Sequence, residues 1–154
     1  MDKLNPQVLV FACNWDGWSC VETAANLGLH YSASVKVVKV NCLSRVHMGL
    51  ILKAFDFGAE GVMLLGCEPG RCHFGAADEY TINEYNKTQN ILEMLGVWKD
   101  RLVLVQLPAF DGRGFVKQIE ALIEEIRQIP SYRRSKIIGP RPVQDVEPSA
   151  LFSV

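Results

Sequence analysis

Cysteines follow three apolar segments of this sequence, each at the point where the segment ends. Cys13 ends the run VLVFAC, and Cys42 ends VKVVKVNC. Cys67 ends GVMLLGC, and Cys72 follows shortly after it in GCEPGRC. Ligands of an open parallel sheet bind outside the carboxyl ends of its strands, so thiols that separate strands deliver there can converge on one point. Four convergent thiolates bind an iron–sulfur cluster or a zinc ion, and the sequence predicts such a site here.

The spacing of these cysteines favours iron over zinc. Structural zinc sites usually take their ligands from paired knuckles with two to four residues between ligands. Here Cys67 and Cys72 form one close pair, in C-x4-C spacing, whereas Cys13 and Cys42 come singly from distant strands. Neighbouring parallel strands lie about 5 Å apart, so adjacent strand ends can reach one two-iron cluster.

Two other functions remain open. A zinc-stabilised protein-interaction module is the main alternative, because zinc also takes four thiolates in tetrahedral geometry. A thiol–disulfide oxidoreductase that uses Cys67 and Cys72 is a weaker alternative, because efficient dithiol motifs generally hold their thiols two residues apart.

The loop after the third apolar segment is suited to a bulky inorganic group. Pro69 and Gly70 favour a sharp turn that brings both cysteines of the loop to one side, and Gly66 leaves room for the backbone to approach the group. Arg45 and Arg71, together with backbone donors of the loop, would offset the negative charge of a thiolate-bound cluster.

Other residues near this edge of the sheet are secondary candidates. Cys20 is expected in the first turn of a helix, whose N-terminus would favour the thiolate, and it is either an alternative ligand or a buried core residue. The three histidines are expected to be solvated or hydrogen-bonded, although His47 and His73 could donate to cluster sulfurs. Trp15 and Trp18 flank the same rim, where they could pack the loop, shield a cluster or meet a redox partner.

Short β-branched segments alternate with longer amphipathic ones, which predicts an α/β fold built from βαβ units. We expect one domain over residues 1–130, an open parallel sheet of about four strands with helices on both faces. The strands are expected at residues 7–13, 35–41, 61–66 and 101–107, and the helices at residues 19–29, 47–57, 76–95 and 114–129. Two lysines in 35–41 place that strand near an edge, whereas 7–13 and 61–66 are expected to be buried on both faces.

The helices are expected to pack through apolar faces. The face of 114–129 comprises Phe115, Ile119, Leu122, Ile123 and Ile126. The core-facing side chains of 76–95 are expected to be Tyr80, Tyr85, Ile91, Leu92 and Leu95. Residues 131–154 contain several prolines and no periodicity, which predicts an irregular, extended C-terminal tail, either solvated or laid over a partner.

Composition narrows the partners and the compartment. The chain has 154 residues and a formal net charge of -1, which suits one domain and gives no electrostatic footprint for nucleic acid or an anionic membrane. The N-terminal apolar run is too short for a signal segment or a membrane span, so we expect a cytoplasmic protein. In a reducing compartment five cysteines are expected to be ligands or redox thiols rather than a disulfide framework.

Three segments carry a family resemblance: FACNWDGWSCVETAA, VNCLSRV and LKAFDFGAEGVMLLGCEPGRCHF. Over about residues 7–129 the sequence resembles the delta subunit of the methyl-viologen-reducing hydrogenase family, most diagnostically in the G-C-x4-C-H-[FY] loop after G-A-[ED]-G-V. The resemblance implies a [2Fe-2S] cluster held by Cys13, Cys42, Cys67 and Cys72. It also implies an electron carrier between a hydrogenase or other dehydrogenase and the flavin-containing subunit of a heterodisulfide-reductase-like complex, which can be electron-bifurcating.

One departure from the family pattern concerns the first cysteine segment. The family commonly has C-N-W-C after the first strand, and here Asp16 stands at the fourth position. Either Cys20 has taken over that role, or the fifth family cysteine is not an essential ligand. Four thiols of the family pattern remain, which is enough for one two-iron cluster.

Overall fold

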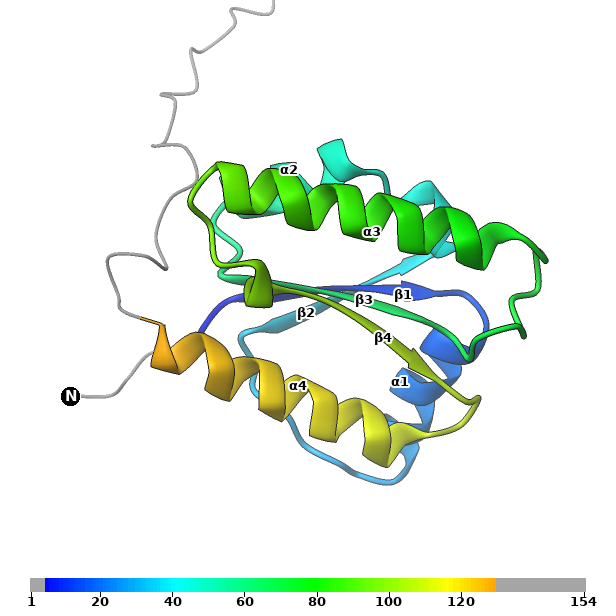
Figure 1. Cartoon of the computed structure of the whole chain (residues 1–154). Helices are drawn as coiled ribbons and strands as arrows, with labels where there is room; N and C mark the ends of the chain where they lie inside the picture. The colour runs from blue at the N-terminus through cyan, green and yellow to red at the C-terminus, as the bar shows by residue number, and fades with distance from the viewer. Residues whose placement is uncertain (1–4, 130–154) are drawn as a thin grey trace, which may run out of the picture.

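The predicted alternation of strands and helices is confirmed in a computed structural model of the chain, which describes residues 5–129 (Figure 1). The strands are β1 (Val8–Cys13), β2 (Val35–Val40), β3 (Gly61–Cys67) and β4 (Leu102–Leu107). The helices are α1 (Asp16–Asn26), α2 (Met48–Asp56), α3 (Ala77–Met94) and α4 (Gly112–Gln128), with short 3-10 helices η1 (Leu43–Arg45) and η2 (Lys99–Arg101). The expected tail at 131–154 lies outside the described residues.

All four strands are parallel and lie in the order β2-β1-β3-β4. The two interior strands are apolar, and every residue of β3 is buried. The edge position predicted for β2 is confirmed by the strand order, and its two lysines and Val38 are exposed. Cys13 is aligned with Val40 of β2, and Cys67 with Leu107 of β4. The cysteine-bearing ends of β1 and β3 therefore lie at the same edge of the sheet.

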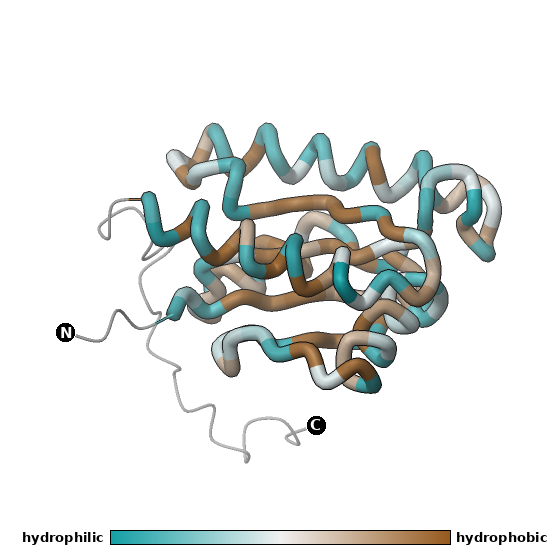
Figure 2. Tube along the Cα trace, turned by 90° about the horizontal axis from the view of Figure 1, so that it is seen from below, coloured by the Kyte–Doolittle hydropathy of each residue, from teal (hydrophilic) through white to brown (hydrophobic). Residues whose placement is uncertain are grey.

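Two helices cover each face of the sheet. Helices α1 and α4 pack on one face, and α2 and α3 lie on the other (Figure 1). The predicted apolar face of α4 is confirmed, because all five of its side chains are buried. Figure 2 shows the apolar strands enclosed between helices whose outer sides are hydrophilic. Within residues 5–129 no helix has both the length and the apolar character to cross a membrane.

The predicted core-facing side of helix α3 is confirmed in part: Leu92 is buried and Tyr85 and Ile91 are half-buried. Tyr80 and Leu95 are exposed, whereas Thr81, Thr88 and Leu92 are buried. The two threonine hydroxyls donate to backbone carbonyl groups one turn earlier in the helix, which satisfies them away from water. Threonine can therefore occupy the buried face of this helix. A prediction based on apolar residues alone does not identify these threonines.

Helix α1 begins at Asp16, three residues before the predicted start at residue 19. Gly17 lies in its first turn and is buried, and a Cβ at this position would overlap the carbonyl oxygen of Leu65 in β3. The start of the helix lies so close to the sheet that only glycine fits at this position. Glycine has a low helix propensity, so the sequence pattern assigned it to a loop.

Candidate metal centre

The structure brings the four predicted cysteines to one small pocket at the carboxyl edge of the sheet. Cys13 ends β1 and Cys67 ends β3, the two central strands. Cys42 follows β2 and precedes η1, and Cys72 lies in the loop between β3 and α3. Cys13, Cys42 and Cys67 are buried, and Cys72 is half-buried. The pocket therefore has an inner side within the protein and an outer side near the surface, at Cys72.

The four thiols form two close pairs. The Sγ atoms of Cys13 and Cys67 lie 3.6 Å apart. The thiols of Cys42 and Cys72 are a second neighbouring pair, since Cys42 helps to raise the pKa of Cys72 and both residues line the pocket. Two thiolates bound to one tetrahedral ion at about 2.3 Å are separated by roughly 3.8 Å, so the first pair has the spacing of two ligands of one metal ion. In the part of the chain that the structure describes, no three His, Cys, Asp or Glu side chains are placed to hold a single ion.

The sharp turn predicted after β3 is confirmed. The N–H of Arg71 donates to the carbonyl oxygen of Glu68 at 3.0 Å, which closes a turn with Pro69 and Gly70 at its centre. Gly70 has a φ of 76°, the left-handed conformation that the third position of a type II turn requires. Its N–H also donates to Oδ2 of Asp78 at 3.0 Å, which ties the loop to the first turn of α3.

A backbone N–H donates to the inner pair of sulfurs, Cys13 and Cys67; Cys42 and Cys72 form the outer pair. The N–H of Gly17 donates to Sγ of Cys13 at 3.2 Å. Hydrogen bonds of this kind stabilise negative charge on sulfur and set the reduction potential of iron–sulfur sites. Gly17 was not among the residues predicted from the sequence, where its signal is a glycine four residues after the first cysteine.

Of the three residues expected to serve an inorganic group, Arg45 and Gly66 lie near the pocket cysteines, and each of the three has further neighbours. Arg71 is exposed and pairs with Glu68 at 3.7 Å. Arg45 is exposed at the end of η1 and lines an open, polar pocket that borders Cys42. A Cβ on Gly66, which lines the cysteine pocket, would lie 2.8 Å from the side chain of Leu43, so this glycine makes room for the leucine.

Burial disfavours the thiolate form of two of the pocket cysteines, Cys13 and Cys72. It raises the pKa of Cys13 from its ordinary value of 9.0 to about 12, and the neighbouring Cys67 adds to the increase. Burial likewise raises the pKa of Cys72 to about 11, with a further contribution from Cys42. Thiolate ligands in this environment need a compensating cation, and metal binding here must release protons.

Cys20 lies apart from the other four cysteines. It is fully buried in the core layer between the sheet and helices α1 and α4, in the second turn of α1. Its thiol donates to the carbonyl oxygen of Pro108 at 3.3 Å. Burial raises its pKa, so the expectation that the helix N-terminus would favour a thiolate was wrong. The structure places Cys20 as a core residue and does not bring it to the pocket.

Aromatic side chains cover the outer side of the pocket. The rings of Trp15 and His73 are stacked, with centroids 3.6 Å apart and planes 18° from parallel. Phe74 meets both rings edge-on, and Trp15 and Phe74 line the pocket. Trp18, expected at the same rim, instead packs against the core on the α1 side, and His47 is exposed at the start of α2. The ring partner of Trp15 is therefore a histidine distant in the sequence.

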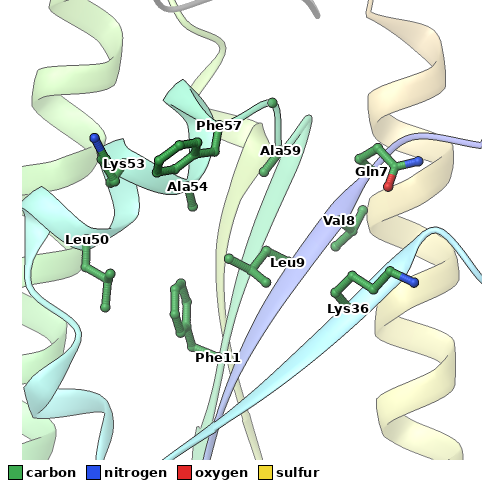
Figure 3. A pocket seen from close by; sticks show the side chains of 11 residues that line it. Gln7, Val8, Leu9, Phe11, Lys36, Leu50, Lys53, Ala54, Phe57 and Ala59 are labelled. Carbon is green, nitrogen blue, oxygen red and sulfur yellow. The ribbon is translucent and has the colours of Figure 1, made fainter. Parts of the chain in front are cut away.

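A second, wider pocket lies towards the opposite end of the sheet (Figure 3). Apolar side chains such as Leu9, Leu50 and Phe57 line it, and Lys36 and Lys53 stand beside them. Among residues 5–129 no cysteine and no acidic side chain lines it, so its chemistry differs from that of the cysteine pocket.

Comparison with known proteins gives consistent matches. A family model described as methyl-viologen-reducing hydrogenase, delta subunit, matches residues 8–130. The vhc iron-sulfur subunit of the F420-non-reducing hydrogenase of Methanococcus voltae is 30% identical over 126 residues, which cover 82% of this chain and 88% of that protein. The iron-sulfur subunit of the F420-non-reducing hydrogenase of Archaeoglobus profundus is 27% identical over 132 residues, covering 86% of this chain and 96% of that protein.

A longer protein also contains a similar stretch. It belongs to the ferredoxin:CoB-CoM heterodisulfide reductase of Methanosarcina mazei, and it is 26% identical over 124 residues, or 80% of this chain. The match spans 16% of that protein, so most of the longer chain has no counterpart here.

Proposed function

The chain belongs to the family of methyl-viologen-reducing hydrogenase delta subunits, and on this premise we propose that it is an electron-transfer subunit with one [2Fe-2S] cluster. The ligands are the thiolates of Cys13, Cys42, Cys67 and Cys72. One observation carries the proposal: four cysteines from three strand ends and a loop line a single pocket as two close pairs. Bound there, the cluster would supply a centre that takes up and releases one electron at a time.

The pairing of the thiols supports two metal ions over one. A two-iron cluster needs two cysteines on each iron, and the Cys13–Cys67 and Cys42–Cys72 pairs provide that set. A single zinc ion would instead draw all four sulfurs around one centre. Zinc therefore remains as an outcome of the test and is not the favoured occupant.

The exposure of the pocket supports electron exchange with another protein. Cys13 and Cys67 are buried, at 3% and 5% exposure, whereas Cys72 is half-buried. Trp15 and Phe74 line the pocket and are exposed at 40% and 54%. Apolar aromatic groups at a surface are typical of protein interfaces, so a partner that covers this edge would lie directly over the sulfurs.

We propose that the electron donor is a hydrogenase or other dehydrogenase subunit and that the acceptor is the flavin-containing subunit of a heterodisulfide-reductase-like complex, which can be electron-bifurcating. The iron-sulfur subunits of hydrogenases among the relatives support the donor. The similar stretch inside a longer heterodisulfide reductase chain supports the acceptor, because fusion into one chain keeps two modules at high effective concentration. In this arrangement the chain carries electrons and is not a catalyst by itself.

Metal analysis of single Cys→Ser variants tests the ligand set. We expect the protein purified without oxygen to contain about two iron and two sulfide per chain. Each of the four single variants, Cys13→Ser, Cys42→Ser, Cys67→Ser and Cys72→Ser, should have a lower iron content and a changed visible spectrum. Cys20→Ser is the matched control and should leave both unchanged, because this thiol lies outside the pocket. A protein that holds one zinc per chain, or a Cys20→Ser variant that loses its iron, would overturn the assignment.

A further inference from the structure

The two cysteine pairs are connected across the pocket by one stack of aromatic rings. Trp15 comes two residues after Cys13, a member of the inner pair, and His73 directly follows Cys72, a member of the outer pair. The ring centroids of Trp15 and His73 are 3.6 Å apart. The stack therefore joins the segment after β1 to the loop after β3 at positions next to one sulfur of each pair.

A third ring supports this stack. Phe74 meets His73 at a centroid distance of 5.1 Å and Trp15 at 6.5 Å, with interplanar angles of 88° and 73°. The N–H of Gly75 donates to the carbonyl oxygen of Cys72 at 3.0 Å, so this cysteine and both rings of the loop belong to one tight turn. The two rings and the Cys72 thiol are therefore carried by the same short backbone segment.

Apart from the Cys72 thiol, which neighbours Cys42 after β2, three backbone contacts of this loop are local. The Glu68–Arg71 turn and the turn from Cys72 to Gly75 close within the loop, and the Gly70–Asp78 hydrogen bond joins it to the first turn of α3. None of these three contacts reaches the segment that follows β1. The ring stack supplies that link and lies on the outer side of the pocket, where it also reduces the access of water.

We propose that Trp15 and His73 are positioning residues that clasp the two cysteine pairs at the spacing the cluster requires. This inference rests on the proposed function. Aromatic pairs contribute about 0.5–1.5 kcal/mol beyond their buried area, which corresponds to a roughly two- to ten-fold change in the population of the opened loop. Loss of the stack should therefore make the cluster more labile without unfolding the sheet.

The test is a double-mutant cycle on the anaerobic, iron-loaded protein. Visible absorption is followed after addition of an iron chelator to Trp15→Ala, His73→Ala and the double variant. Each single variant should lose iron roughly two- to ten-fold faster than the parent protein, and the double variant no faster than the quicker single one, because both changes remove the same stack. Trp15→Phe should restore most of the lifetime.

Trp98→Ala is the matched control. Trp98 has the same exposure as Trp15, at 40%, and precedes η2 at another part of the surface. Its replacement should leave the lifetime unchanged. Single variants that lose iron at the parent rate, or effects that multiply in the double variant, would overturn the clasp.

A second measurement separates this inference from the proposed function. If the parent protein holds no iron, the electron-transfer proposal fails, and the clasp is tested on the reduced, metal-free chain by maleimide labelling and mass spectrometry. Trp15→Ala should then label at Cys67 and Cys72 roughly two- to ten-fold faster than the parent, because the loop opens more often. Equal labelling rates would contradict the clasp whatever the metal content.

Discussion

Gly17 and Cys13 form the direct link between helix α1 and the cysteine pocket. The N–H of Gly17 donates to Sγ of Cys13 at 3.2 Å, and a Cβ at position 17 would overlap the carbonyl oxygen of Leu65. The first turn of α1 also presents the positive end of the helix dipole. Because Gly17 has no side chain, the backbone of α1 can approach β3 closely. This approach also places the Gly17 N–H within hydrogen-bond distance of the Cys13 sulfur.

Gly17→Ala should therefore damage both the fold and the site. The added Cβ strikes a backbone atom of a central strand, so α1 must move away, and we expect the free energy of unfolding to fall by about 1–3 kcal/mol. The weakened N–H···S bond should shift the reduction potential of the loaded protein to a more negative value. Urea unfolding and an EPR-monitored potential titration measure the two effects.

Gly49→Ala is the control for that substitution. Gly49 also lies in a helix, but the atoms nearest to an added Cβ belong to the side chain of His47, at 3.1 Å, which can turn away. Its stability and potential should stay close to those of the parent. Gly17→Ala with parental stability and potential would contradict the close approach.

Phe110 is held in an unfavourable backbone conformation at the same edge of the sheet. Its φ is 67°, and its side chain is 74% exposed. The left-handed region costs a residue with a bulky side chain about 1–2 kcal/mol, and asparagine tolerates it better. Phe110→Asn should raise the free energy of unfolding by about 1 kcal/mol, measured by urea unfolding.

Phe57→Asn is the matched control for Phe110→Asn. Phe57 is 79% exposed but has an ordinary φ of -81°. The same chemical change there should give no stabilisation. Equal effects at the two positions would show that the gain comes from removing an exposed aromatic ring and not from relieving the backbone.

The stability of the reduced, metal-free chain should fall at alkaline pH. The pKa of Cys13 is about 12 in the folded protein, against an ordinary value of 9.0, and that of Cys72 is about 11. Below pH 9 both thiols are protonated in the folded and unfolded chains, so they contribute no pH dependence. Between pH 9 and about 11 to 12 the unfolded thiols ionise first, which favours unfolding.

Urea midpoints measured from pH 7 to pH 11 test this dependence. Cys13→Ser should show a smaller loss above pH 9 than the parent protein, because one of the two shifted groups is gone. An identical loss in both proteins would mean that Cys13 is not held protonated by its surroundings.

The sheet and the convergence of the cysteines could be predicted because they depend on local patterns. The apolar runs that end at Cys13 and Cys67 predicted central strands, and the lysines of 35–41 predicted an edge strand. Parallel strands place their carboxyl ends together, so thiols at those ends share one edge whatever the details of packing. The site prediction therefore depended on two features: the α/β alternation, and the rule that parallel strands end at the same edge of the sheet.

Features that depend on contacts between distant residues were not predicted. The buried face of α3 includes Thr81 and Thr88, whose hydroxyls are satisfied within the helix, so hydropathy identified only part of that face. The stack of Trp15 on His73 joins two loops that are far apart in the sequence, and nothing in either loop indicates its partner. The division of the thiols into two pairs likewise depends on the strand order and on the path of the loop after β3, which spacing alone does not determine.

An EPR spin count on the anaerobically purified protein, titrated with a one-electron reductant, tests the central claim most directly. The account predicts about one spin for every two irons and two sulfides, in a signal that Cys13→Ser or Cys72→Ser alters and Cys20→Ser leaves intact. A colourless protein that contains zinc and gives no signal on reduction would contradict it.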